Sequence, residues 1–208
     1  RIIVMSRTYQ LSSIADDMLL TSDAANALLT RHLRRRMDAE SLRDSMLKAS
    51  GQLNLAPAEG SIIRHRDILI NLAGNLHQPS KHRSVYLCYL RSSPPPELAA
   101  FDLPDFTTVT GKRDVSTIPN QALYLCNSPF VIDQSERLAA TVINTTGDNE
   151  TRIELAWHWV FGRNATPDEI QNAVEFLRVA QNELHSEQKT WASLCQALLV
   201  TNEFRYVD

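Results

Sequence analysis

The chain has 208 residues, of which 43% are hydrophobic and 22% charged, so it can bury a substantial core and has a globular composition. Its formal net charge of -3 argues against a nucleic-acid-binding protein that is basic over its whole surface. No run of about eighteen apolar residues is present, which excludes a membrane-spanning helix.

The chain opens with an amphipathic segment, residues 1–13, in which Ile2, Ile3 and Val4 follow one another. This segment lacks the apolar core and the small-residue cleavage site of a signal peptide. Because the first residue is arginine rather than methionine, we expect Arg1 to lie inside a longer precursor. We further expect the segment to form a first helix that packs against whatever precedes it, which makes an upstream segment the first predicted partner.

The strongest local signal is residues 31–51, which place four arginines in six positions and then add acidic residues. We interpret this stretch as one helix. The ion pairs expected on that helix are Arg34 with Asp38, Arg36 with Glu40, and Glu40 with Arg43. Because these acids would neutralise half of the positive charge and repel a phosphate backbone, the pattern argues against nucleic-acid binding through Arg31–Arg36. It favours a partly buried ion network centred on Glu40.

Prolines, glycines and polar residues interrupt every periodic run in the middle of the chain, residues 51–115. The best strand candidate there is residues 84–90, which are rich in β-branched, aromatic and apolar side chains. Three prolines, Pro94–Pro96, end it, and residues 101–106 are expected to form a loop or a single helical turn.

Helical periodicity returns after this irregular middle. Helices are predicted over residues 119–127, 129–144, 153–161, 166–184 and 191–199. Thr166, Pro167 and Glu169 form a helix start with a capping box, and Gly162 stands where a C-terminal cap belongs. The sequence therefore predicts a mainly α protein: one domain over residues 1–208, a multi-helix bundle with an irregular, loop-rich middle and at most one short strand or hairpin.

Motifs of known reactions are missing from the sequence. It has no GxSxG, no HExxH, no dinucleotide fingerprint and no complete phosphate loop, although Gly111-Lys112-Arg113 is superficially similar to one. His65, His77 and His82 match no common metal-ligand spacing, so we expect surface histidines and no metal site. Asp102, Asp105 and Asp114 are the acids in a loop that could form a calcium site or an acid/base pair, although aspartates in such loops commonly cap turns.

The three cysteines, Cys88, Cys126 and Cys195, are far apart and form no CxxC or CxxCH motif. We expect buried free thiols, no internal disulfide, and neither haem nor zinc bound by this chain.

Seven segments of the chain resemble the signature segments of a planctomycete-specific C-terminal domain of unknown function, the one numbered fifteen-fifty-three. The segments are SRTYQLSS (6–13), RRRMDAESLRDSMLKASG (34–51), RSVYLCYLR (83–91), FDLPD (101–105), STIPNQALYLCNSPFV (116–131), FGRNATPDE (161–169) and NEFRYVD (202–208). They occur in the family's order and cover nearly the whole chain, which is similar to the C-terminal part of the family pattern. The resemblance implies an exported, multi-domain protein with a haem c module in another domain, and it brings no established activity or active site.

Several polar residues match the family's signature positions inside apolar segments. Since unpaired buried charge is costly, they indicate either a buried hydrogen-bonded network or a site. The network would comprise Arg7, Arg36, Glu40, Arg43, Asp44, Arg83 and Gln121. The site would be a pocket between the FDLPD loop and the Glu40 helix, with Asp102, Asp105, Glu40 and Arg113 as its catalytic candidates.

Three functions fit these observations. The leading hypothesis is a non-catalytic helical interaction or scaffold module of a larger exported protein, partnered by its own upstream segment or domains. The second is part of an enzyme or carbohydrate-handling protein that uses the acidic and arginine pocket. The third is nucleic-acid binding through Arg31–Arg36, which the paired charges disfavour.

Overall fold

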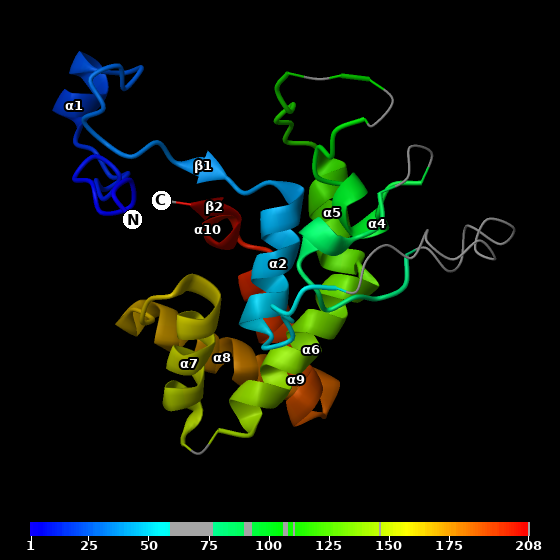
Figure 1. The fold of residues 1–208 in the computed structure, drawn as a ribbon. Coiled ribbons are helices and arrows are strands. Elements are labelled where there is room, and N and C mark those ends of the chain that lie inside the picture. Colours follow the sequence, from blue (N-terminus) through cyan, green and yellow to red (C-terminus); the bar gives the residue numbers. More distant parts are fainter. Residues whose placement is uncertain (59–76, 90–92, 106–107, 110, 146, 208) are drawn as a thin grey trace, which may run out of the picture. The chain divides into compact units, whose positions relative to one another are not determined.

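The computed structural model describes residues 1–58, 77–89, 93–105, 108–109, 111–145 and 147–207. The chain divides into two compact units (Figure 1). Unit 1 consists of Arg1–Met37 together with Arg205–Asp208, and unit 2 of Asp38–Phe204. Both are mainly helical or irregular, and the described residues contain one two-stranded sheet, as the sequence predicts.

The first helix of unit 2 is α2, Ala39–Ala49. It begins there because the Asp38 side chain accepts a hydrogen bond from the backbone N–H of Ser41 and so caps the helix. The single helix expected over residues 31–51 is therefore wrong: Arg34, Arg35 and Arg36 precede the cap and do not share a helix with the acids that follow.

The irregular middle contains two short elements, the 3-10 turn η3, Ser84–Tyr86, and the helix α4, Pro96–Ala99. The strand expected at residues 84–90 is absent from the described residues 84–89. Val85 is 67% exposed, and Ser84 is fully buried with its N–H and hydroxyl bonded to the Asp44 carboxylate. A side-chain hydrogen bond from another element thus replaces the strand ladder that the local composition suggests.

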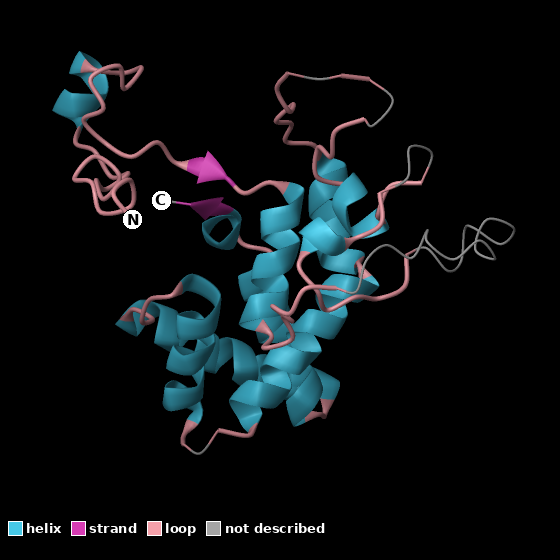
Figure 2. Ribbon diagram, viewed as in Figure 1, coloured by secondary structure: helices cyan, strands magenta, loops and turns pink. Residues whose placement is uncertain are grey.

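Two prolines set the start of the next helices, α5, Pro119–Asn127, and α6, Pro129–Ile143. Both helices agree with the sequence prediction. α6 is the centre of unit 2, because it packs along α9 and also contacts α2, α5 and α7 (Figures 1 and 2).

The remaining helices of unit 2 are α7, Asn149–Phe161, α8, Pro167–Leu184, and α9, Glu187–Leu199. The predicted capping box at Thr166 and the left-handed cap at Gly162, with φ 73°, are both confirmed. α8 packs on α9, and α7 contacts α6, α8 and α9. The core between them contains the predicted stripes; its fully buried members include Leu138, Val142, Ile153, Cys195 and Leu199.

Unit 1 has little regular structure. Residues 2–10 form consecutive turns instead of the expected first helix, and the one helix wholly inside the unit is α1, Asp17–Ser22. The strands β1, Arg35–Arg36, and β2, Tyr206–Val207, pair antiparallel, and the short helix α10, Asn202–Arg205, leads into β2. The Met37 N–H extends this pairing by donating to the carbonyl of Arg205.

Within the described part of the chain, no helix is long and apolar enough to span a membrane.

Candidate functional site

Arg43 is the centre of a polar cluster inside unit 2. Its side chain projects from α2 and is 1% exposed. The guanidinium donates to Glu97 Oε2 on α4 at 2.8 Å and to the backbone carbonyls of His82 and Ser80, and it lies 5.4 Å from the Phe130 ring centroid on α6. A buried guanidinium requires hydrogen-bond acceptors for its N–H groups, because an unpaired buried charge is costly. Arg43 therefore ties α2 to residues 80–82, to α4 and to α6.

Asp44, the next residue of α2, continues the cluster. Its Oδ1 accepts from both the N–H and the hydroxyl of Ser84, at 2.8 and 2.7 Å. The Arg83 guanidinium lies 3.9 Å from Asp44 Oδ2 and is largely exposed. Together, Arg43 and Asp44 hold the irregular middle of the chain against α2.

Glu40, one turn earlier on α2, pairs with Arg113. The two side chains form a bidentate ion pair with N–O distances of 2.6 and 2.8 Å. The pair is accessible to solvent, since Glu40 is 23% and Arg113 42% exposed. Next to it, burial and then the Glu40 charge raise the pKa of Tyr89 to about 12, so this phenol stays neutral and is no general base near pH 7.

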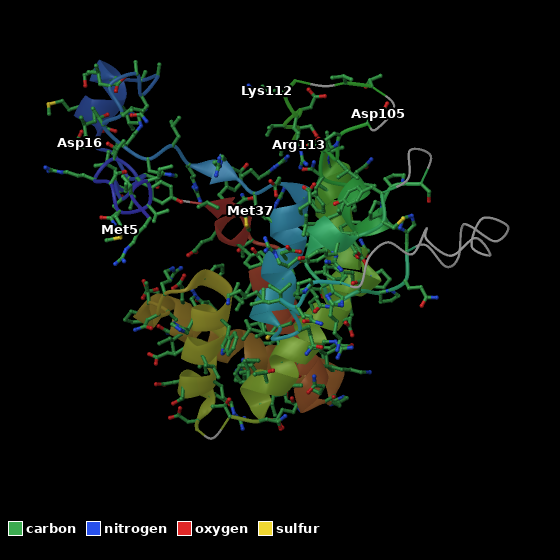
Figure 3. All side chains as sticks on the ribbon, viewed as in Figure 1. Met5, Asp16, Met37, Asp105, Lys112 and Arg113 are labelled. Carbon is green, nitrogen blue, oxygen red and sulfur yellow. The ribbon has the colours of Figure 1, made fainter. Side chains whose placement is uncertain are left out.

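Asp102 and Asp105, the two acids of the FDLPD loop, have different surroundings. Asp102 has a left-handed backbone, with φ 54°, and both its carboxylate oxygens accept from Ser116, one from the N–H and one from the hydroxyl. The Ser116 hydroxyl in turn lies 3.5 Å from the amide nitrogen of the buried Gln121. Asp105 is exposed; Figure 3 shows it on the outer part of the loop between α4 and α5, while Arg113 lies nearer to α2.

The structure thus brings together some of the predicted site residues and not others. Glu40 and Arg113 are in contact, whereas Arg43 pairs with Glu97 and not with Glu40 as expected. Arg36 lies in β1 of unit 1, and Arg7 is also in unit 1, where its side chain makes no hydrogen bond with any residue that the structure describes.

Two of the three histidines weighed as metal ligands have separate partners. His77 Nε2 bonds to Ser93, His82 Nδ1 bonds to the Ala56 carbonyl, and His65 lies outside the described residues. Asp114 is exposed. Among the residues that the structure describes, no three histidine, cysteine or acidic side chains are grouped as metal ligands would be.

The basic run at residues 31–36 is not a set of unpaired cations on one helix face. Arg31 is 9% exposed and donates to the carbonyls of Asp23 and Ala24, both at 2.8 Å. The Arg34 guanidinium lies 5.2 Å from the centre of the Tyr206 ring. Arg31 is consequently a structural group of unit 1 and is not available to a phosphate.

A larger cavity than the space beside Arg43 and Phe101 lies elsewhere in unit 2. It is a pocket of about 500 Å³ between the end of α2, residues 79–81, the start of α4 and the turn from α5 to α6. Beside Arg43 and Phe101, where the first residue of the FDLPD loop approaches α2, the structure has a small space of about 10 Å³.

Sequence reasoning missed Glu97, Phe130 and this larger pocket. Glu97 stands 54 positions after its partner Arg43, so no helical spacing could connect them. A usable signal was present, because Glu97 follows Pro96 at a helix start and is an acid in an otherwise apolar stretch.

The fold and the polar clusters define a mainly helical protein whose irregular segments are anchored to one helix by buried and half-buried ion pairs. The chain belongs to the PSD1 family, described as protein of unknown function (DUF1553), whose sequence profile matches residues 1–177. No curated protein and no solved structure is detectably similar to it.

Proposed function

We propose that this chain is a non-catalytic helical interaction module of a larger exported protein, and that unit 1 is the part that docks onto an upstream segment of that protein. The family resemblance supports the context: a planctomycete-type multi-domain protein with a haem c module in another domain. The chain itself needs no cofactor for this role.

One observation carries the proposal: the buried side chains of unit 1 are polar, and most of its large apolar side chains are exposed. No apolar side chain among residues 1–37 and 205–207 is buried, whereas Asp23, Asn26, Arg31 and Arg205 are. At the same time Ile2 is 90% and Ile14 87% exposed. Further exposed apolar side chains of this unit are Ile3, Val4, Met5, Met18, Leu20, Leu28, Leu29 and Leu33 (Met5 is labelled in Figure 3).

The polar interior gives unit 1 a defined conformation to present these side chains. The Asp23 carboxylate accepts from the N–H groups of Ala27 and Leu28, and the Asn26 amide bonds to the backbone of Arg31 at both its oxygen and its nitrogen. Exposed apolar side chains on an ordered frame are typical of an interface. Each of them would contribute about 2 kcal/mol if a partner buried it fully.

The polar residues of unit 2 support a non-catalytic role. Glu40 is paired with Arg113 and Asp102 with Ser116, so these two candidate acids anchor loops. The acid/base site expected between the FDLPD loop and α2 would instead place Glu40 and Asp102 together, with oxygens available to a substrate.

The proposal is tested by titrating the chain with the segment that precedes Arg1 in its precursor, using calorimetry. We expect saturable binding that Ile2→Ser together with Ile14→Ser weakens at least about tenfold, because two large apolar contacts are lost. Val115→Ser, which alters an apolar residue of unit 2 that is 74% exposed, is the control and should leave binding unchanged.

Absence of heat with the upstream segment would contradict the docking role. Turnover of glycoside, ester or phosphate substrates that Asp102→Asn abolishes would instead favour the enzyme hypothesis. Salt-dependent DNA binding lost in Arg35→Gln would favour the nucleic-acid hypothesis.

A further inference from the structure

We propose that the 500 Å³ pocket of unit 2 binds a neutral, hydroxyl-rich ligand, namely one or two saccharide rings. The pocket lies between the end of α2, residues 79–81, the start of α4 and the turn from α5 to α6, wholly within unit 2. This inference goes beyond the docking role proposed for unit 1 and does not rest on it.

Two carboxylates in the pocket wall are held in place by one oxygen each. Glu97 Oε2 accepts from Arg43 Nε, and Asp133 Oδ2 accepts from the Gln134 amide and from Arg137 Nε. Their other oxygens, Glu97 Oε1 and Asp133 Oδ1, accept no hydrogen bond from any residue that the structure describes. Both are therefore oriented acceptors that remain available to donors of a ligand.

The pocket also offers donors. The side-chain amide of Gln52 makes no hydrogen bond within the described part of the chain, and Lys81 and Arg137 contribute cationic N–H groups to the wall. A ligand that complements this wall has to donate and accept at several points. Hydroxyl groups do both.

The charges of the wall balance, because Lys81 and Arg137 oppose Glu97 and Asp133. An anionic ligand would meet two carboxylates and a cationic ligand two cations, at a cost in either case. A neutral ligand avoids both costs.

Most of the remaining wall is apolar, apart from Ser80, Ser128 and Gln134. Tyr124, Phe130 and Pro129 line it, and the guanidinium of Arg43 lies over the Phe130 ring and fixes it. Rings with an apolar face and polar edges fit a wall that combines aromatic surface with a few oriented polar groups. Saccharide rings have that shape, and the volume is in the range of small-ligand pockets.

The test uses the full chain, labelled with nitrogen-15, titrated with cellobiose, maltose and xylobiose at millimolar concentrations while amide chemical shifts are followed. We expect at least one disaccharide to shift the amides of Gln52, Lys81 and Asp133 in a saturable way. A glucose phosphate and a proline-rich peptide, tested in parallel, should leave these amides unshifted.

Two variants make the result specific. Asp133→Asn removes the charge of one acceptor at a position that is 47% exposed, and should weaken binding about tenfold because a charge-assisted hydrogen bond is lost. Glu136→Gln removes the same charge from an exposed position of α6 outside the pocket, and should bind as the unmodified chain does.

Three outcomes would overturn the proposal. They are no shift with any of the disaccharides, pocket shifts produced by the peptide or the phosphate instead, and equal weakening by Asp133→Asn and Glu136→Gln. The calorimetric result for the upstream segment is independent of all three.

Discussion

Arg43 and Glu40 are one turn apart on α2, yet their surroundings differ. Arg43 is buried and has side-chain or backbone partners on three other segments, whereas Glu40 forms its bidentate pair at the surface. Buried charges that lose a partner are strongly destabilising, while exposed pairs contribute little.

We therefore expect Arg43→Met to lower the free energy of unfolding by about 3 kcal/mol, since Glu97, Ser84 and two carbonyls lose their donor. Glu40→Gln should cost only about 1 kcal/mol or less because water screens that pair. Urea denaturation of both variants checks this. Equal losses would contradict the difference in burial.

The three cysteines also differ in burial. Cys195 and Cys88 are buried, and burial raises the pKa of both thiols, that of Cys195 to about 12. Cys126 is exposed, so the expectation that all three are buried is wrong for this residue.

We predict that iodoacetamide modifies Cys126 first in the native chain and all three cysteines after denaturation without a reductant. Intact mass spectrometry measures both states. A denatured, non-reduced mass that shows only one alkylated cysteine would reveal a disulfide and refute the prediction.

Glu169 makes stability depend on pH. The Arg163 guanidinium, followed by the backbone of Thr166, lowers the pKa of Glu169 from 4.5 to about 2. Because the pKa of Glu169 is lower in the folded than in the unfolded chain, ionised Glu169 stabilises the fold above about pH 4.5. This stabilisation is lost as the pH falls towards 2.

Glu169→Gln should therefore flatten the fall of the melting temperature between about pH 4.5 and pH 2, by a modest amount because the pair is about one-third exposed. Glu154→Gln, an exposed position on α7, controls for the change in net charge. If Glu169→Gln follows the unmodified chain through this range, the linkage is refuted.

At the scale of elements, helix ends are set by single residues. Gly162 ends α7 with φ 73°, and a Cβ there would meet no atom within 4 Å. A substitution at Gly162 is therefore destabilising because an L-residue is strained in the left-handed backbone conformation, and not because its Cβ meets another atom.

Gly162→Ala should lower the free energy of unfolding by about 1 kcal/mol. The matched variant is Gly111→Ala, where a Cβ also meets nothing and the backbone is not left-handed, so stability should be unchanged. Thermal denaturation of both compares them. A neutral Gly162→Ala would show that the left-handed cap is dispensable.

The helices of unit 2 were predictable from the sequence because their signals are local. Pro119, Pro129 and Thr166 mark helix starts, and the apolar spacing between them gives the buried faces. The strand at residues 84–90 was predicted wrongly because local composition does not reveal that the Ser84 backbone bonds to Asp44, which is 40 positions away.

The candidate site was less predictable for the same reason. Glu40 and Arg113 were both identified from the sequence, but their pairing spans 73 positions and depends on how the loop before α5 folds back to α2. Arg31–Arg36 was read as helical because the Asp38 cap, which starts α2 after the arginines, was not recognised.

At the scale of the whole molecule, the two units differ in how they are stabilised. Unit 2 has a continuous apolar core between its helices, whereas the described part of unit 1 buries polar groups and exposes its apolar ones. Domains are normally stabilised by apolar burial, so the proposed docking role would bring unit 1 to that state. This contrast is the basis of the docking role.

Hydrogen exchange tests that role most directly. Amide exchange of residues 1–37 is measured in the isolated chain and in the longer precursor, with residues 129–199 of unit 2 as the internal reference. We predict that residues 1–37 exchange much more slowly in the precursor, because an upstream segment covers Ile2, Ile14 and their neighbours, while the reference is unchanged. Equal exchange of residues 1–37 in both proteins would contradict the docking role.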